Sequence, residues 1–529
     1  MVFWKFFNKT VDIIRPNNAS KNSDVSKPTY TSDNIHKNIS KIKKEMGDSD
    51  DLAVNEFESK EIDFKYAIVY LKGLVNDNTL NNLSMQVISL FNGGYTDKKS
   101  FLDTFESLLF NGKDTAESNN YEELCLYLLS GYTVILIDGR KKFIAINTFY
   151  PQGRSVGEPT SQTIIRGPKE AFTEKIEDNI ALVRKRVKST HVRVEKLTLG
   201  YISRTNVCLM YMENIAKEEI VAEIKNRLNK IKTDGVLEGG VIEQLIKDDP
   251  YSPFPTIANS EKPDTVAASV MEGKVAIYID GTPYILLLPC LFWENFQVSE
   301  DYYHHFIVAS FIRLIRYISF LLALLVPSLY IAFTSFHQEM IPTPLLISIA
   351  AQREGLPFPA FLEALIMEIT FEILHEAGIR MPRAIGSAIS IVGALVLGQA
   401  AVEAGIISAV MVIIVSLTAI ANVTIANYEM GNAVRVTRFG FMIMAATFGL
   451  YGLFMAGIVL TLHLCKLKSI GVPYWTGVAP KVKTMNDKFI RPPSWKMKYR
   501  PPFSKELEIP KIDMEQASKS GNEKKQELR

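Results

Sequence analysis

The chain of 529 residues is 47% hydrophobic and 22% charged, and its formal net charge is +2. This length can hold two or three domains, and the small net charge excludes the strongly basic surface typical of nucleic-acid-binding proteins. The four cysteines show no CxxC spacing, so the sequence indicates neither a zinc site nor a disulfide framework. We therefore expect no nucleic-acid partner, no metal and no cofactor.

The first 60 residues are expected to form a disordered leader. From about residue 15 they are rich in Asn, Ser, Lys and Asp, and their scattered apolar residues cannot offset the entropy lost on ordering. The opening MVFWKFFNKT has an apolar part too short for a signal peptide, so the region that follows is expected in the cytoplasm. The aromatic tip of this leader either rests on a membrane surface or plugs the next domain.

Two related α/β subdomains are predicted, over residues 61–165 and 166–300. A strand, a turn and an amphipathic helix are indicated by KYAIVYLKGLVNDNTLNNLSMQVISLF, and the order is repeated in TNVCLMYMENIAKEEIVAEIKNRL. An Asp-Gly hairpin follows each of them. The strands begin 141 residues apart and the hairpins 142 apart, at Tyr66 and Val207 and at Asp138 and Asp280. Two interpretations remain open, a ligand module in each copy or a duplicated scaffold for packing and assembly.

The sequence contains no motif of a known catalytic machinery. It has no phosphate loop, no GxSxG elbow and no HExxH zinc motif. The dipeptide at His375 and Glu376 lacks the second histidine at helical spacing. The chain is therefore not expected to be an enzyme.

A transmembrane domain is predicted over residues 301–467. Four windows contain no Asp, Glu, Lys or Arg and have the roughly 20 residues that a helix needs to cross a membrane: 317–338, 384–402, 404–428 and 439–465. Residues 468–529 form a basic, Pro-rich tail, expected to be extended and to lie on the cytoplasmic face near anionic headgroups. Since both ends are expected in the cytoplasm, the number of complete crossings is even.

The segment 357–378, PFPAFLEALIMEITFEILHEAG, is a membrane-length apolar helix that carries four glutamates. Because four clean windows already give an even number, this segment is expected to be a re-entrant or interfacial helix. Four residues at its ends are expected to act as hinges: Pro357, Pro359, Gly378 and Pro382. This topology places Arg435 and Arg438 on the outer side of the membrane, against the usual charge bias.

Three of the four glutamates share one helix face, within about 80° at roughly 100° per residue: Glu368, Glu372 and Glu376. Phe361 and Leu365 continue this stripe, whereas Glu363 lies about 140° from it. A charged carboxylate that faces lipid is costly, so the stripe needs water, headgroups or charged partners. In one interpretation the helix lies at the interface, with the stripe wet and paired with Arg380 and Arg383. In the other, several copies arrange their stripes around a common axis, where glutamate rings attract cations and the two apolar residues form a constriction.

Three stretches are long and specific enough to indicate a family: GPKEAFTEKIEDNIALVRKRV, VPSLYIAF and PFPAFLEALIMEITFEILHEAGIRMPRAIGSAISIVGALVLGQAAVEAGIISAVMVIIVSLTAIANVT. Together they resemble the A subunit of the nutrient germinant receptors of bacterial endospores, the GerA family. The resemblance runs from about Phe64 to Ser469 and leaves the leader and the basic tail unassigned.

The resemblance implies a multi-pass subunit in the spore inner membrane that acts with a transporter-like B subunit and a lipoprotein C subunit. It also implies the response, in which small nutrients trigger release of monovalent cations and germination. The B subunit is then the better candidate for the nutrient pocket, and copies of the A subunit form the ion-conducting element, with residues 358–376 lining the pore. The alternative is a nutrient-binding or scaffold subunit that conducts no ions.

Overall fold

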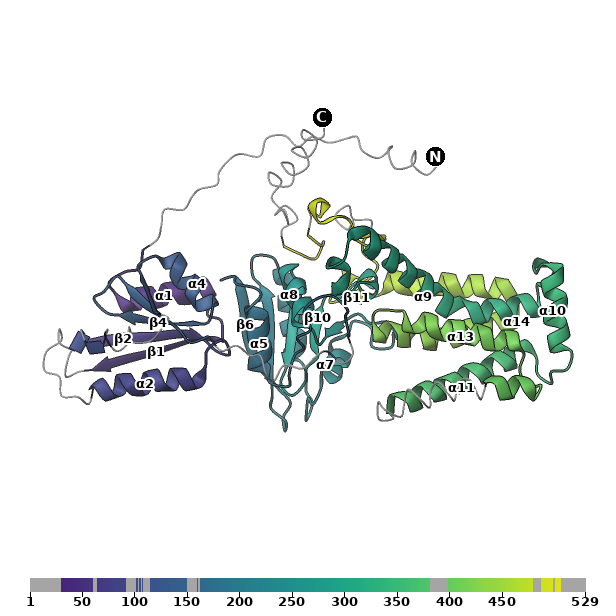
Figure 1. Cartoon of the computed structure of the whole chain (residues 1–529), viewed down its shortest axis with the longest axis horizontal. Helices are drawn as coiled ribbons and strands as arrows, with labels where there is room; N and C mark the ends of the chain where they lie inside the picture. The colour runs from purple at the N-terminus through teal and green to yellow at the C-terminus, as the bar shows by residue number, and fades with distance from the viewer. Residues whose placement is uncertain are drawn as a thin grey trace, which may run out of the picture.

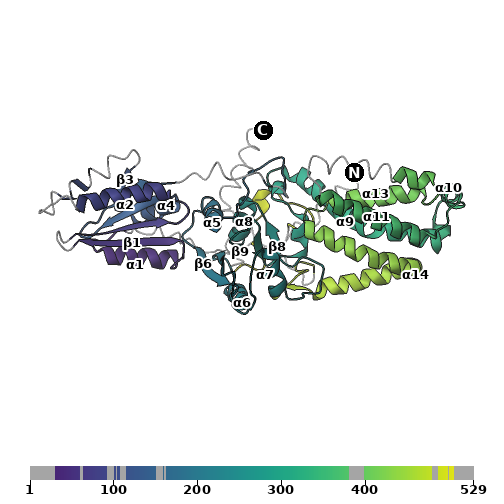
Figure 2. The same cartoon turned by 90° about the horizontal axis from the view of Figure 1, so that it is seen from below.

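The computed structural model describes residues 30–59, 64–91, 101–102, 104–105, 107, 115–149, 159, 162–380, 398–478, 487–497 and 500–505. Two α/β subdomains and a helical bundle follow one another along the long axis of the molecule (Figure 1). The view from below shows the same order (Figure 2). The predicted fold class, an α/β region of two related subdomains followed by a helical membrane domain, is confirmed.

The first subdomain is a five-stranded antiparallel sheet in the order β1-β2-β4-β5-β3. Its strands have these bounds: β1 (Leu52–Ser59), β2 (Phe64–Leu71), β3 (Thr115–Ser118), β4 (Tyr132–Ile137) and β5 (Phe143–Asn147). Helices α1 (Ile35–Met46) and α4 (Tyr121–Leu129) cover one face of the sheet, and α2 (Asp77–Phe91) covers the other together with the helical residues Phe101 and Phe105. Successive residues of β2 point to opposite faces of the sheet. Ala67 and Val69 pack with α1 and α4, whereas Tyr66 and Ile68 pack with α2.

The second subdomain repeats this architecture, with the strand order β6-β7-β9-β10-β8. Its strands have these bounds: β6 (Val192–Leu199), β7 (Thr205–Met212), β8 (Ala258–Ser260), β9 (Val275–Ile279) and β10 (Ile285–Leu288). Helices cover both faces in pairs: α5 (Ile176–Arg184) with α8 (Pro263–Met271), and α6 (Glu218–Asn229) with α7 (Gly239–Ile246). The identical order of the two sheets bears out the duplication inferred from the sequence.

The same set of hydrogen bonds connects a helix to the Asp-Gly hairpin in both subdomains. The side chain of Asn38 exchanges two hydrogen bonds with the backbone six residues earlier, and the Asp138 carboxylate accepts the first N–H of α1. Asn179 and Asp280 make the same bonds around α5. Since these pairs lie 141 and 142 residues apart, the repeat begins at α1 and not at β2.

The predicted leader of residues 1–60 is too long, because it includes α1 and β1. Ile35, Ile39, Ile42 and Met46 form one helix face and are buried against the sheet. Each has an apolar counterpart 141 residues later: Ile176, Ile180, Val183 and Val187. Extending the 141-residue repeat toward the N-terminus would therefore have predicted α1 from the sequence. The earlier part of the predicted leader, residues 1–29, lies outside the described residues.

A buried ion pair joins the two subdomains. The guanidinium of Arg184 on α5 donates from Nε and Nη2 to the two carboxylate oxygens of Asp51, at 2.8 and 3.0 Å, and both side chains are almost fully buried. Ser49 adds a further bond to this guanidinium, and its hydroxyl accepts the backbone N–H of Val194 on β6. The loop between α1 and β1 thus anchors the first subdomain to the edge strand of the second.

The bundle contains five described helices: α9 (Phe306–Ser335), α10 (Thr343–Arg353), α11 (Ala360–Arg380), α13 (Ala409–Val423) and α14 (Tyr428–Lys466). Of the described helices, α9 and α14 are long and apolar enough to cross a membrane. The window 404–428 corresponds to α13, whose 15 residues span about 22 Å. Most of the window 384–402 lies outside the described residues.

Helix α14 is a hairpin, so the window 439–465 is not one straight crossing. Gly449 has a non-helical backbone, with φ 60° and ψ −138°. A Cβ built on Gly452 would lie 2.1 Å from the carbonyl oxygen of Met444, a contact that a straight helix cannot make across eight residues. The limbs 428–448 and 450–466 extend about 32 Å and 26 Å. Figure 2 shows the two limbs meeting beside the label α14 and separating toward the second subdomain.

Both ends of α14 meet the second subdomain. Next to the first limb, Asn427 donates to Asn295, and His463 near the end of the second limb lies 2.8 Å from the Ser252 hydroxyl. Gly449, at the turn, lies against Phe336 just after α9. We call the end of the bundle that contacts the second subdomain the near end, and the opposite end the far end.

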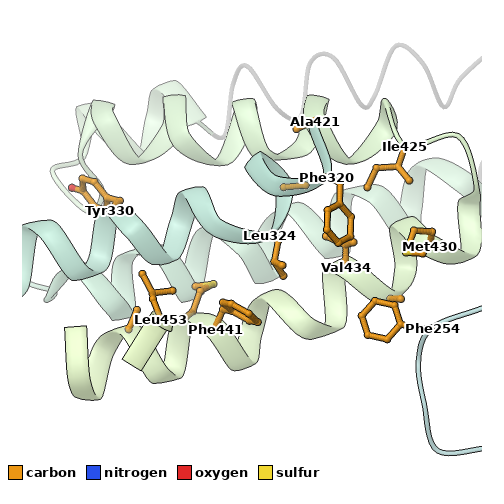
Figure 3. Close-up of a cluster of buried hydrophobic side chains, with 14 of the residues drawn as sticks. Phe254, Phe320, Leu324, Tyr330, Ala421, Ile425, Met430, Val434, Phe441 and Leu453 are labelled. Atoms are coloured by element: carbon orange, nitrogen blue, oxygen red, sulfur yellow. The ribbon is translucent and has the colours of Figure 1, made fainter. Parts of the chain in front are cut away.

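An apolar core holds α9 between α13 and the limbs of α14. Figure 3 shows Phe320 and Leu324 of α9 facing this core, together with Val434 and Phe441 of the first limb. Leu453 of the second limb lies beside Phe441. At the far end, α10 lies across the bundle (Figure 1). The core thus extends along the bundle between its two ends.

The segment after α14 is docked, although the sequence predicted an extended free tail. It contains β11 (Lys468–Ser469), β12 (Val472–Pro473) and the 3-10 turn η4 (Ser494–Lys496). Ile470 and Phe503 are buried in the core of the second subdomain, and Ser504 forms a β-bridge with Ala216. The apolar residues spaced among the prolines explain this docking, because the overall basic composition concealed them.

We predict that Asp51→Ala destabilises the chain by about 3–5 kcal/mol, because it leaves the Arg184 guanidinium buried without its counter-ion. Thermal unfolding of the purified chain in detergent measures the loss. Glu56→Ala on β1 is the matched control, because its carboxylate is half exposed and its removal should change stability by less than about 0.5 kcal/mol. Equal effects of the two variants would contradict the anchoring role of this pair.

Candidate functional site

The acidic segment forms one continuous helix, α11, of 21 residues and about 32 Å. Pro357 and Pro359 lie just before its first turn, where proline does not interrupt a helix. Gly378 lies inside its last turn, and Pro382 lies outside the described residues. The helix packs beside α9, α13 and α14, so it runs along the bundle.

Glu368 forms a fully buried ion pair with the first limb of α14. Its Oε2 accepts a hydrogen bond from Nη1 of Arg438 at 2.5 Å, and neither side chain is more than 1% exposed. The Nε of Arg438 also donates to the carbonyl oxygen of Ala323 on α9, at 2.7 Å. Glu368 Oε1 and Arg438 Nη2 have no hydrogen-bond partner among the described residues. The pair therefore links three helices, α9, α11 and α14. It also leaves one carboxylate oxygen and one guanidinium nitrogen in the bundle interior without a hydrogen bond to the described residues.

Glu372 forms a second ion pair one turn further along the helix. Arg435 donates two hydrogen bonds to the carboxylate of Glu372, from Nε at 3.0 Å and from Nη2. Its Nη1 donates to the side-chain oxygen of Asn432. Both side chains are mostly buried, at 22% and 16% exposure. This bidentate geometry is the strongest form of an arginine-carboxylate contact. Glutamates four residues apart on α11 thus meet arginines three residues apart on α14.

Glu376, the third member of the stripe, is exposed and paired on its own helix. Arg380 donates to its carboxylate at 2.7 Å, four residues further along α11. An exposed pair of this kind contributes little to stability. The stripe therefore runs from a fully buried charge at Glu368 to a solvent-accessible charge at Glu376.

The two apolar residues predicted on the stripe are half buried. Phe361 packs against the core of the bundle, and Leu365 is also partly covered. The face of α11 that is exposed in the single chain is aliphatic, with these residues: Leu362, Ile366, Ile369 and Ile373. In the single chain, then, the stripe faces the interior of the bundle from Phe361 to Glu372, whereas Glu376 is exposed.

The position of Arg435 and Arg438 bears on the topology conflict of the sequence analysis. They lie 7 and 10 residues into α14, about 11 and 15 Å from its near end. Because α14 is a hairpin, both arginines lie in the half of the bundle next to the second subdomain, and their predicted outer position in the membrane stays a prediction. The sequence showed these two charges but not their partners, since the pairing depends on how two distant helices align.

Sequence reasoning missed a role for Glu363, which lay off the stripe. Its carboxylate is fully buried and accepts hydrogen bonds from the hydroxyl and the backbone N–H of Ser408, the latter at 2.6 Å. Ser408 is the N-cap of α13, where a negative charge is favourable. Arg353 at the end of α10 lies 3.9 Å from the same carboxylate. The fourth glutamate therefore ties α10, α11 and α13 together at the far end.

This arrangement buries the charges of Glu363, Glu368 and Glu372 inside the bundle and leaves the pair of Glu376 and Arg380 exposed. Among the described residues, no group of three or more His, Cys, Asp and Glu could hold a metal ion. The four α11 carboxylates can accept protons, bind cations or exchange arginine partners.

The architecture is that of a protein with tandem α/β subdomains followed by a helical bundle, in which two helices are long and apolar enough to cross a membrane. The family model described as "Bacillus/Clostridium GerA spore germination protein" matches residues 40–503. Since the match covers most of the 529 residues, the chain belongs to this family.

Individual relatives agree with this assignment. The chain is 43% identical over 477 residues to spore germination protein KA of Bacillus subtilis (strain 168), covering 90% of this chain and 87% of that one. It is 38% identical over 473 residues to spore germination protein GerLA of Bacillus cereus, covering 89% and 95%.

A solved structure also matches the soluble half. It is the crystal structure of the N-terminal domain of the A subunit of the Bacillus megaterium spore germinant receptor GerK3. That domain is 30% identical to this chain, with a TM-score of 0.40, and the match covers 50% of this chain and 99% of the domain.

We predict that Arg438→Gln costs about 3–5 kcal/mol, because it leaves the carboxylate of Glu368 buried and unpaired. The double variant Glu368→Gln/Arg438→Gln should recover much of this loss, since it removes both charges. Thermal unfolding of the chain in detergent measures both. Arg380→Gln is the control and should cost less than about 1 kcal/mol, because its pair with Glu376 is exposed. A similar cost for Arg438→Gln and Arg380→Gln would contradict the buried pairing.

Proposed function

We propose that the chain is a membrane subunit of a spore nutrient germinant receptor, and that several copies of its bundle form a cation-conducting element. The observation that carries this proposal is the stripe of α11, which places a carboxylate on each of three successive helical turns. Two of these carboxylates, Glu368 and Glu372, are paired with arginines of α14. Desolvating such charges is expensive, and pairing only limits the cost. A purely structural helix could use apolar residues at these positions, so we attribute the charges to ion handling.

In this conformation the arginines make the stripe nearly neutral. Arg438 and Arg435 occupy the carboxylates of Glu368 and Glu372, so these side chains offer little attraction to a cation. We assign the structure to the closed state. Opening separates the pairs and turns the stripe toward an axis shared with other copies, where Glu368, Glu372 and Glu376 form rings that attract monovalent cations.

The apolar residues of the stripe supply the gate in this mechanism. Phe361 and Leu365 lie one to two turns before Glu368, toward the far end, and they form a hydrophobic constriction that closes by dewetting. Pro357 and Pro359 at the start of α11, and Gly378 and Pro382 at its end, allow the helix to tilt. A nutrient bound in a partner subunit shifts the equilibrium between the two arrangements.

The soluble half is positioned to transmit such a signal to α9. Asp301, in the 3-10 turn η2 (Ser299–Tyr302), accepts hydrogen bonds from Arg316 at 2.8 Å and from Arg313 at 3.3 Å. Arg313 and Asp301 are almost fully buried. Because breaking a buried pair is costly, a displacement of the second subdomain moves the start of α9 with it.

The proposed setting is the spore inner membrane, with both soluble ends of the chain on the cytoplasmic side. The proposed partners are a transporter-like B subunit, a lipoprotein C subunit, further copies of this chain and monovalent cations. The family membership supports this setting, and the two long apolar helices support a membrane location.

We predict opposite effects for removing the two buried glutamates of the stripe and for removing one of their arginine partners. The combined variant Glu368→Gln/Glu372→Gln should lower nutrient-triggered cation flux about tenfold, the effect of raising the barrier by roughly 1.4 kcal/mol. Arg435→Gln should instead raise flux in the absence of nutrient, because it frees the carboxylate of Glu372. Flux is measured with the receptor reconstituted in liposomes, and assembly is checked by size.

The control for this experiment is Glu354→Gln, an exposed carboxylate at the end of α10 that lies off the stripe. It should leave flux unchanged. Unaltered flux and selectivity in the glutamate variant would remove the stripe from the ion pathway. A loss of flux in both the glutamate and the arginine variants would indicate only a structural role.

The alternative is a subunit that binds nutrient and conducts nothing. A shallow polar depression in the second subdomain favours it, lined by loop residues that include Lys175, Arg204 and Asp280. The two functions predict different behaviour of the purified chain. We expect a stable homo-oligomer whose melting temperature does not change with nutrient, whereas a monomer stabilised by nutrient would support the alternative.

A further inference from the structure

The C-terminal segment 487–497 contacts the first third of α9. The hydroxyl of Tyr317 donates to the carbonyl oxygen of Lys488, at 3.1 Å. Further along, Ser310 exchanges two hydrogen bonds with the backbone of Arg491, at 3.1 and 3.2 Å. At the start of α9, the ring of Phe306 meets the ring of Trp495 edge-on. The segment therefore runs antiparallel to α9 over about 17 Å.

Two arginines of this contact point inward. Arg313 of α9 is fully buried and is held by Asp487 at 2.5 Å. Arg491 is 5% exposed, and its guanidinium donates to the carbonyl oxygens of His304 and Tyr302 at 2.5 and 3.1 Å. The segment thus fixes its position through buried polar contacts.

The apolar side chains of the same segment point outward. Phe489 is 47% exposed, Ile490 is 61% exposed and Trp495 is 55% exposed. The adjoining surface of α9 is also aliphatic and aromatic, with these exposed residues: Ile307, Val308, Phe311, Leu314, Ile315 and Ile318. Charges inside and apolar groups outside is the reverse of the arrangement that water favours.

The position of this exposed apolar surface along α9 indicates which part of a bilayer would surround it. The uncharged window of α9 begins at Tyr317, beside Phe489, and the exposed apolar surface continues beyond it at Leu321. Residues 306–316, which carry two arginines, therefore lie where the hydrocarbon gives way to headgroups. Tryptophan and tyrosine favour this layer, and the exposed Lys496 is suited to anionic headgroups.

We propose that the C-terminal segment is a membrane-surface anchor, in which Phe489, Ile490 and Trp495 insert into the interfacial layer of an anionic bilayer beside α9. Its continuity with the lipid-facing surface of α9 favours lipid over a second copy of the chain as the occupant. The proposal requires only that the bundle spans a membrane. It holds whether or not the chain conducts cations, so the two proposals fail independently.

Site-directed spin labelling of the full chain tests this anchor. Ile490→Cys and Trp495→Cys are made on a Cys465→Ser background, since the other three cysteines are buried. The labelled chain is placed in nanodiscs of phosphatidylglycerol and phosphatidylethanolamine in equal parts. The accessibility of each nitroxide to dioxygen, which concentrates in lipid, is compared with its accessibility to a water-soluble nickel chelate.

Two sites of similar exposure calibrate the result. Val459→Cys, on the second limb of α14, represents lipid, and Leu126→Cys, on α4 of the first subdomain, represents water; the native side chains are 62% and 56% exposed. We expect the labels at 490 and 495 to show an oxygen-to-nickel ratio several-fold above that at 126 and close to that at 459. A ratio equal to that at 126 would overturn the proposal. Shielding from both reagents would also overturn it, because protein would then cover the surface.

Discussion

The bundle depends on one constraint, which is that a carboxylate carried to membrane depth needs a partner. Helix α11 brings four glutamates into the bundle, and the chain supplies Arg438, Arg435, Arg380 and the N-terminus of α13 to meet them. The registers of α11, α13 and α14 follow from these contacts, because a shift of one helix by one residue would leave a charge buried without compensation. Apolar packing alone tolerates many registers between helices. The need to pair each buried charge selects one of them.

The soluble half and the bundle are joined by the same kind of contact. Asp51 and Arg184 fix the two subdomains to each other, and Asp301 with Arg313 fixes the second subdomain to α9. A chain of buried ion pairs therefore extends from the first subdomain to the first membrane helix, and further pairs link α11 to α14. Buried pairs of this kind contribute little net stability but resist rearrangement one at a time. They suit the function proposed above, in which the receptor stays closed until a stimulus shifts several contacts together.

The sequence revealed what is periodic and local. The repeat at Tyr66 and Val207, the Asp-Gly hairpins and the stripe on α11 all follow from spacing alone, and the two sheets indeed share one strand order. The missed features are non-local. Helix α1 was concealed by a polar composition, the turn at Gly449 by an unbroken apolar window, and the partners of Glu368 and Glu372 by a separation of 70 and 63 residues. No spacing rule reports which distant helix will lie beside another.

The most direct test of the account is an experimental density map of the assembled chain in a lipid nanodisc without nutrient. The account predicts that α11 helices of several copies surround a shared axis, with density joining Glu368 to Arg438 and Glu372 to Arg435. A map with α11 at the lipid-facing rim of the assembly, or with these carboxylates separated from the two arginines and no central opening, would contradict it.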